Sequence, residues 1–160
     1  MEALLPFFQW CDATTVSEWI RESRWIFPLI ETFHILALTV LFGTVLAIDL
    51  RLMGAGLKSQ PVSAIARHLG PWMRGSLAVI LVTGVLLFLS EAMKCYGNDA
   101  FRFKMVALLL ALGFQFTVFA YVTSPAGEVK VRPIGRKAVA LVSMALWLGV
   151  GIGGRAIGFV

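Results

Sequence analysis

The feature that most constrains the fold of this chain is an apolar stretch from Trp25 to Arg51. It has no charged residue between positions 35 and 48, and before that only Glu31 and His34 interrupt it. A helix of about 20 mostly apolar residues spans the hydrocarbon core of a bilayer, which is about 30 Å thick. The stretch therefore predicts a transmembrane helix. The same core disfavours ionisable groups, so Glu31 and His34 within it indicate a function.

The composition of the whole chain agrees with a membrane protein. Hydrophobic residues make up 59% of the sequence and charged residues 14%, whereas an ordinary soluble domain has about 25% charged residues. The net charge is +5, but the basic residues lie between the apolar stretches. We therefore interpret them as determinants of membrane topology. Binding to nucleic acid is not expected.

The predicted fold is an all-α membrane protein, a four-transmembrane-helix bundle with an amphipathic N-terminal interfacial helix. All 160 residues form a single membrane domain. The four spans cover about 25–50, 71–93, 103–123 and 138–159, and the interfacial arm covers 1–24. Residues 62–69 are expected to form a separate interfacial helix, with Pro71 in the first turn of the second span.

The N-terminal arm mixes apolar and charged side chains, as a helix in the membrane interface does. Its acidic start is not typical of a signal peptide. Thr14 or Thr15 is a candidate helix cap, with Glu18 placed for a capping box. We expect the arm to fold back on the outer ends of the bundle. Cys11 and Cys95 fall on the same side, where they form either a disulfide or two separate buried thiols.

The distribution of Lys and Arg predicts the orientation. The loops at 49–74 and 124–137 contain eight of these residues, and the opposite side contains six. Only the first side has more basic than acidic residues. The positive-inside rule then places both termini outside. For a bacterial inner (cytoplasmic) membrane this means a multi-pass protein with periplasmic termini.

His34 is the strongest candidate for binding a cofactor or metal. It lies three residues after Glu31, hence on the same helix face, and roughly 12–14 Å below the outer surface. His68 is expected at the opposite interface, so one chain cannot bring both histidines to one metal. The alternative is a neutral His34 hydrogen-bonded to Glu31 or to a neighbouring helix. Counting inward from the expected outer ends places several residues at the depth of His34, namely Thr83, Gly84, Gly113, Gln115, Trp147, Leu148 and Gly149.

Other residues near the outer surface complete the candidate site. Glu31 is either a ligand or a group that orients His34. Met93 and Met105 offer thioethers for haem iron or copper. Three cationic side chains also lie near the outer surface, namely Lys104, Arg102 and Arg155. They are expected to hold haem propionates or to pair with Glu31, or else to extend toward the membrane surface without a ligand.

The sequence resembles an uncharacterised bacterial family of small four-span inner-membrane proteins. This resemblance is carried by His34, Leu36, Gly43, the run 49–54, Pro71, Trp72 and the run 101–104. More distantly, His34, Arg51 and Lys104 are similar to the haem-containing, oxygen-independent protoporphyrinogen oxidase family (HemJ-type). The chain also resembles the membrane domain of the CopD copper-resistance family, which shares a first-span His and the late Lys. These resemblances imply a haem or copper site at His34.

The leading functional prediction is a b-type haem protein of the inner membrane in electron transfer or redox chemistry, with His34 as axial ligand. The alternatives are a copper-handling protein that uses His34, Met93 and Met105, and a cofactor-free accessory subunit. Expected partners are the lipid bilayer, further copies of the chain in a homo-oligomer, and a redox partner protein or quinone. The sequence has no motif of a hydrolytic or phosphoryl-transfer enzyme.

Overall fold

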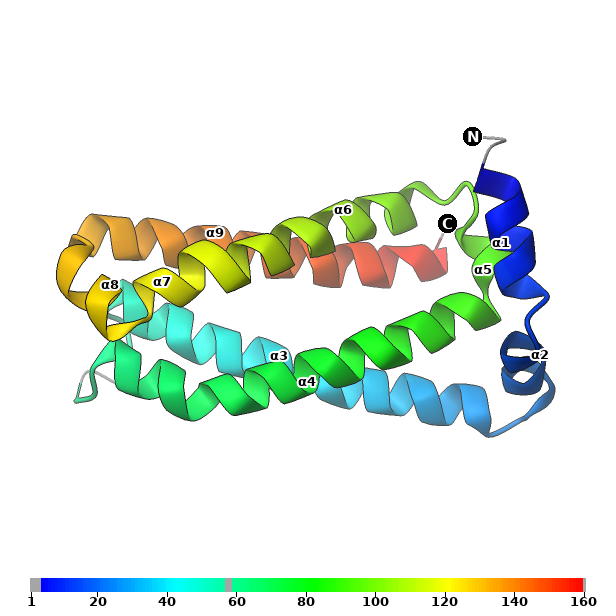
Figure 1. Ribbon diagram of the computed structural model, residues 1–160, viewed down its shortest axis with the longest axis horizontal. Helices are drawn as coiled ribbons and strands as arrows, with labels where there is room; N and C mark the ends of the chain where they lie inside the picture. Colours follow the sequence, from blue (N-terminus) through cyan, green and yellow to red (C-terminus); the bar gives the residue numbers. More distant parts are fainter. Residues whose placement is uncertain (1–3, 57–58, 160) are drawn as a thin grey trace.

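A computed structural model describes residues 4–56 and 59–159, and within these ranges the chain is helical with no strand. The elements run α1 (Leu5–Asp12), α2 (Thr15–Glu22), α3 (Ile26–Met53), α4 (Val62–Ser90), α5 (Ala92–Cys95), α6 (Asp99–Phe114), the π-helical segment η2 (Gln115–Phe119), α7 (Ala120–Val122), α8 (Pro125–Lys130), α9 (Pro133–Ala156) and the short 3-10 turn η3 (Ile157–Phe159). The long helices α3, α4, α6 and α9 lie side by side (Figure 1). One end of the bundle carries α1, α2 and α5, and we call it the arm end; the other is the α8 end.

Within these ranges, four helices are long and apolar enough to cross a membrane, as predicted. They cover Ile26–Met53, Val62–Ser90, Asp99–Val122 and Pro133–Phe159. Large apolar side chains cover their outer faces; Val82, Leu109 and Ile152 are each more than 60% exposed. Such a surface is unfavourable in water and suits lipid. The all-α, four-span prediction is therefore confirmed.

The second span differs from the prediction. We expected a break before Pro71, but α4 runs unbroken from Val62 to Ser90, with Pro71 inside it. Proline removes one backbone hydrogen bond, which membrane helices tolerate when neighbouring groups compensate. Gly70 gives the Arg74 side chain room beside the proline, since a Cβ at Gly70 would come 3.2 Å from Arg74 Nη1. The separate helix predicted at 62–69 was wrong.

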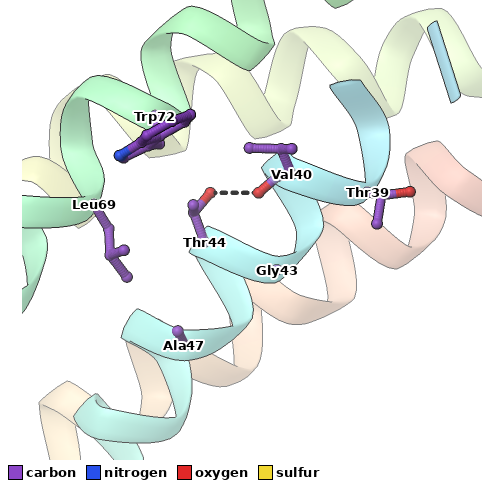
Figure 2. Close-up of a pocket in the computed structure, with 7 residues that line it drawn as sticks. All are labelled: Thr39, Val40, Gly43, Thr44, Ala47, Leu69 and Trp72. Carbon is purple, nitrogen blue, oxygen red and sulfur yellow. Dashed lines mark hydrogen bonds between the residues drawn. The ribbon is translucent and has the colours of Figure 1, made fainter. Parts of the chain in front are cut away.

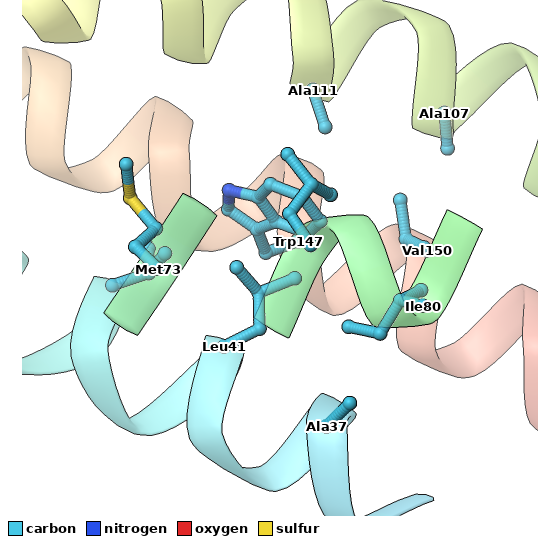
Figure 3. Packing of buried hydrophobic residues seen from close by; sticks show 10 residues of the cluster. Ala37, Leu41, Met73, Ile80, Ala107, Ala111, Trp147 and Val150 are labelled. Atoms are coloured by element: carbon cyan, nitrogen blue, oxygen red, sulfur yellow. The ribbon is translucent and has the colours of Figure 1, made fainter. Parts of the chain in front are cut away.

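The interior of the bundle consists of two apolar clusters. The first lies in the middle of the four spans (Figure 3) and consists of Ala37, Leu41, Val45, Met73, Leu77, Ile80, Ala107, Ala111, Trp147 and Val150. The second lies toward the α8 end and consists of Ile48, Leu52, Val62, Ile65, Phe119, Val122 and Ala140. Each of the four spans contributes to both clusters, the third through η2 and α7 in the second cluster, so the two clusters together fix the rotation of the helices relative to one another.

The arm folds back on the bundle, as expected. Thr14 caps α2 by accepting a hydrogen bond from Ser17 N at 3.3 Å. The Ser17 hydroxyl donates to the Leu89 carbonyl at the end of α4 at 2.8 Å. Phe8 packs edge-on against Phe88, with ring centroids 5.5 Å apart. The arm therefore closes one end of the bundle (Figure 1).

Both cysteines are buried free thiols in this structure. Cys11 belongs to α1 and Cys95 to α5, and these two helices pack together. The prediction that the thiols share one side of the bundle is therefore confirmed. Of the two states expected for them, the structure contains the separate thiols.

At the opposite end, a side chain of α8 caps α4. Glu128 accepts hydrogen bonds from Val62 N at 2.8 Å and Ser63 N at 3.0 Å. These N–H groups lie in the first turn of α4, where no backbone partner exists. Gly127 allows this approach, because a Cβ there would overlap the Tyr121 carbonyl. The region predicted as a loop is thus a short helix that closes the bundle.

Candidate functional site

The site begins with a hydrogen bond between the first and second spans. His34 Nδ1 lies 2.7 Å from Thr83 Oγ1. The imidazole also lies against Gly84, where a Cβ would come 3.5 Å from His34 Cε1. Counting residues inward from the expected outer ends of the spans placed Thr83 and Gly84 at the depth of His34. The structure confirms this prediction for these two residues. Of the two hydrogen bonds considered for His34, the one to a neighbouring helix is present and the one to Glu31 is not formed.

The hydroxyl of Thr83 determines which nitrogen of His34 carries its proton. Thr83 Oγ1 lies 2.6 Å from the Val79 carbonyl, which can only accept. The single hydroxyl proton therefore goes to Val79, and Thr83 accepts from His34 Nδ1–H. In the neutral imidazole, Nε2 is then the nitrogen with the free lone pair. Within residues 4–56 and 59–159, no group hydrogen-bonds to Nε2.

Lys104 is the second polar side chain at this level. It is half-buried in α6 and close enough to His34 to interact with it electrostatically. Its stem lies along the backbone of α9: a Cβ at Gly153 would come 3.1 Å from Lys104 Cβ, and one at Gly154 would come 3.6 Å from Lys104 Nζ. Among the described residues its ammonium group has no hydrogen-bonded or ion-paired partner.

The other predicted site residues lie around the arm end without converging on His34. Arg102 forms an ion pair with Asp99 at 3.1 Å, and Arg155 stacks over the Phe159 ring, 4.7 Å from its centroid. Glu31 is exposed. Met93 and Met105 are 40% and 38% exposed. The structure thus brings together His34, Thr83 and Lys104, and leaves the remaining candidates at the surface.

His68 lies far from this site, as predicted. It is exposed near the start of α4, and its Nδ1 lies 2.8 Å from the Ala64 carbonyl. Fifteen residues of α4 separate it from Thr83, roughly 22 Å along the helix axis. No group of three or more His, Cys, Asp or Glu side chains gathers anywhere in the described part of the chain. A carboxylate-rich metal centre is therefore not formed by these residues.

Comparison with known protein families gives a match that covers nearly the whole chain. The model of a family of unknown function, DUF6644, matches residues 7–160. The chain belongs to the DUF6644 family. No curated protein and no solved structure matches it. The predicted membership of an uncharacterised family is confirmed, and the resemblance to the HemJ-type oxidases and to CopD stays a prediction.

The DUF6644 chain also contains a polar contact that the sequence did not reveal. Gln115 Nε2 donates to Met73 Sδ, and Trp147 Nε1 donates to Gln115 Oε1, both at 3.2 Å. Met73 precedes Thr83 by ten residues, so this contact lies roughly 15 Å from His34 along the bundle. The expectation that Gln115 and Trp147 share the depth of His34 was wrong. Helix α6 begins at Asp99, four residues earlier than predicted, so Gln115 lies deeper.

A shallow groove on the outside of this DUF6644 bundle lies between α3 and α4 (Figure 2). Its volume is about 370 Å³, and Thr39, Val40, Gly43, Thr44, Ala47, Leu69 and Trp72 line it. The Thr44 hydroxyl donates to the Val40 carbonyl at 2.9 Å, so it has no proton left to donate into the groove. The groove is apolar and faces the lipid, and no predicted site residue lines it.

Proposed function

We propose that this protein is a b-type haem protein of the bacterial inner membrane, with His34 Nε2 as an axial ligand to the iron. The observation that carries the proposal is the hydrogen bond between His34 Nδ1 and Thr83 Oγ1. A second hydrogen bond at the far nitrogen fixes the tautomer and orientation of metal-ligating histidines in general. Here it leaves Nε2 unprotonated and, among the residues that the structure describes, without a partner.

The residues around His34 fit such a group in two respects. Gly84 keeps the imidazole free of a neighbouring side chain. Lys104 supplies an ammonium group near His34 that has no ion-pair partner in the described part of the chain, and such a group suits the carboxylate of a propionate. When bound, haem supplies one-electron redox chemistry, with a potential set by the axial ligands and their surroundings. The chain's own contribution is to hold His34 in one tautomer and to present a cation beside it.

A second strong axial ligand is not available near His34 within the described ranges. Met93 and Met105 lie at the surface, and His68 lies near the other end. We propose that the protein forms a homo-oligomer and that His34 of a second copy completes the coordination. Symmetric dimers bring the same residue of two chains together at the two-fold axis.

The proposed orientation follows from the positive-inside rule, which places both termini in the periplasm. The arm end, and with it His34, then faces the periplasmic half of the membrane. A redox partner protein or a membrane quinone is the expected electron donor or acceptor. Reporter fusions at Ser59 and Glu128 test this orientation: periplasmic activity at either position contradicts it.

The decisive experiment is the absorption spectrum of the purified protein. We expect a Soret band from bound haem, a strong loss of this band in His34→Ala, and its retention in the matched control His68→Ala. Full haem content in His34→Ala would exclude His34 as the ligand. A colourless protein that contains copper would favour the copper-handling alternative. A colourless protein without metal would leave the His34–Thr83 hydrogen bond as a structural contact in an accessory subunit.

A further inference from the structure

A second ionisable residue lies inside the bundle, far from His34. Asp49 belongs to α3, four residues before the helix ends at Met53. Its exposed fraction is 0%. Fifteen residues separate it from His34, roughly 22 Å of helix, so it lies in the half of the bundle nearer the α8 end. An acidic side chain buried in a membrane helix is costly and is a functional candidate by default.

The carboxyl group of Asp49 has no conventional partner. Neither of its oxygens forms a hydrogen bond within residues 4–56 and 59–159. The hydroxyl of Ser143 in α9 is close enough to interact with the carboxyl group. Ser143 is also 0% exposed, and its Oγ forms no hydrogen bond of normal geometry. Two fully buried polar groups therefore face each other across the α3–α9 contact with their hydrogen-bonding capacity unused.

Among the described residues, no Lys, Arg or His forms an ion pair with the Asp49 carboxyl group. Ile48 and Leu52, which flank Asp49 in α3, and Ala140, three residues before Ser143 in α9, belong to the apolar cluster at the α8 end. Arg51 donates to the Gln60 carbonyl, and Arg136 acts electrostatically on Glu128. The remaining charged or titratable side chains at this end, on α4, α8 and α9, are exposed: Arg67, His68, Arg74, Lys130 and Lys137. An ionised Asp49 would thus be buried without compensation, which is among the costliest arrangements in a protein.

We propose that Asp49 and Ser143 form an intramembrane proton-binding site, in which the carboxyl group holds one proton and donates it to the Ser143 hydroxyl. The proton comes from water at the α8 end of the bundle and returns there on release: a hydronium ion and the carboxylate give water and the carboxylic acid. Binding removes the uncompensated charge and uses the hydroxyl that is otherwise without a partner. The site is independent of any cofactor at His34.

The test is infrared spectroscopy of the purified full-length protein in lipid vesicles. A protonated carboxyl group in an apolar site gives a carbonyl stretch that is separate from that of ionised carboxylates. We expect this band near neutral pH, with a shift when the sample is transferred to D₂O. Asp49→Asn should abolish it. Ser143→Ala should keep the band and move it to higher frequency, because the carboxyl group loses its hydrogen-bond acceptor.

Asp99→Asn is the matched control. Asp99 has a side chain that is 89% exposed and pairs with Arg102, so the band should stay unchanged in this variant. The spectra are compared only between variants that elute from a size-exclusion column at the volume of the folded protein. Asn has nearly the same shape as Asp, so we expect Asp49→Asn to fold. An absent band in the wild-type protein near neutral pH, or an unchanged band in Asp49→Asn, would overturn the proposal.

Discussion

Trp147 donates a hydrogen bond to Gln115 at 3.2 Å, and this bond joins α9 to the η2 segment of the third span in the interior of the bundle. Gln115 extends the contact to α4 by donating to Met73. Three of the four spans are thereby linked by one buried amide. Gln115 is 2% exposed and Trp147 is 3% exposed. Such a contact specifies which helix faces meet, because any other rotation leaves the amide unpaired in an apolar interior.

This contact gives the first prediction, which concerns stability. Gln115→Leu removes both hydrogen bonds and leaves Trp147 Nε1 buried without an acceptor. We expect a loss of about 1 kcal/mol in the free energy of unfolding, in the range measured for hydrogen bonds between membrane helices. Denaturation in detergent micelles checks it. The control Thr117→Val changes an exposed neighbour in the same segment and should have a smaller effect; equal losses would contradict the role of Gln115.

The second prediction concerns Thr83. Thr83→Val removes the acceptor for His34 Nδ1–H but keeps the shape of the side chain. If His34 binds haem, this variant should retain haem with reduced affinity, by about 10-fold or more, as is typical when a partner that orients a metal ligand is lost. Its reduction potential should shift as well. Haem titration and redox potentiometry measure the two effects. Thr39→Val changes an exposed threonine five residues after His34 in α3 and should change neither of them.

The third prediction concerns the pH dependence of the thiols. Burial raises the pKa of Cys11, and burial together with the Glu91 charge raises that of Cys95, against the opposing charges of Lys104 and Lys94. The thiolate is the reactive form. Both cysteines should therefore react with iodoacetamide more slowly than a free thiol at mildly alkaline pH. Unfolding should abolish the difference. Rapid labelling of the folded protein would show that the arm is not docked.

The same shifts have a consequence for stability. Because the folded state retains the thiol protons more strongly than the unfolded state, the contribution to stability is complete below the ordinary thiol pKa. It is lost as the pH rises through the higher folded values. Melting temperatures across this alkaline range should fall more steeply for the wild-type protein than for the Cys11→Ala, Cys95→Ala double variant.

The fourth prediction concerns the cap on α4. Burial alone would raise the pKa of Glu128, but hydrogen bonds from Ser63 and Val62 and the charge of Arg136 outweigh it and lower the pKa. Stability from this group is complete above the ordinary carboxyl pKa and is lost as the pH falls through the lower folded value. Glu128→Ala should cost about 1 kcal/mol at neutral pH, the typical value of a helix N-cap.

Thermal denaturation in detergent at neutral and acidic pH measures this effect. The difference between Glu128→Ala and the wild-type protein should shrink at acidic pH, where the wild-type carboxylate is protonated. Glu22→Ala provides the control, since Glu22 is exposed on the arm. A similar loss in both variants would argue against a specific cap by Glu128.

Some features of this fold can be predicted from the sequence alone, and others depend on packing between distant parts of the chain. The four spans were predictable because apolar length alone decides them. The pairing of His34 with Thr83 followed from depth counting, since both spans have clear outer ends. Gln115 was misplaced because Asp99 and Arg102 were assigned to a loop, whereas they form the first turn of α6. The position of a helix end depends on caps such as Asn98, whose side chain accepts from Phe101 N.

The burial of Asp49 could not be predicted from the sequence. In the sequence it stands beside Arg51 at the end of an apolar stretch, where charged residues usually mark the membrane surface. Its full burial depends on the rotation of α3 against α9, which places Asp49 inward and leaves Arg51 free to reach the Gln60 carbonyl. Rotation of one helix against another is set by packing of side chains from distant parts of the chain.

The π-helical segment at Gln115–Phe119 has a consequence for the family as a whole. A π turn contains one residue more than an α turn, because its hydrogen bonds reach one residue further. A relative that lacks one residue here would form a regular α-helix and still direct Phe119 and Val122 into the same cluster. Elsewhere in a span, a one-residue deletion rotates all later side chains by about 100°. Alignments of the family should therefore place single-residue gaps in this segment, and the remaining length of each span should be invariant.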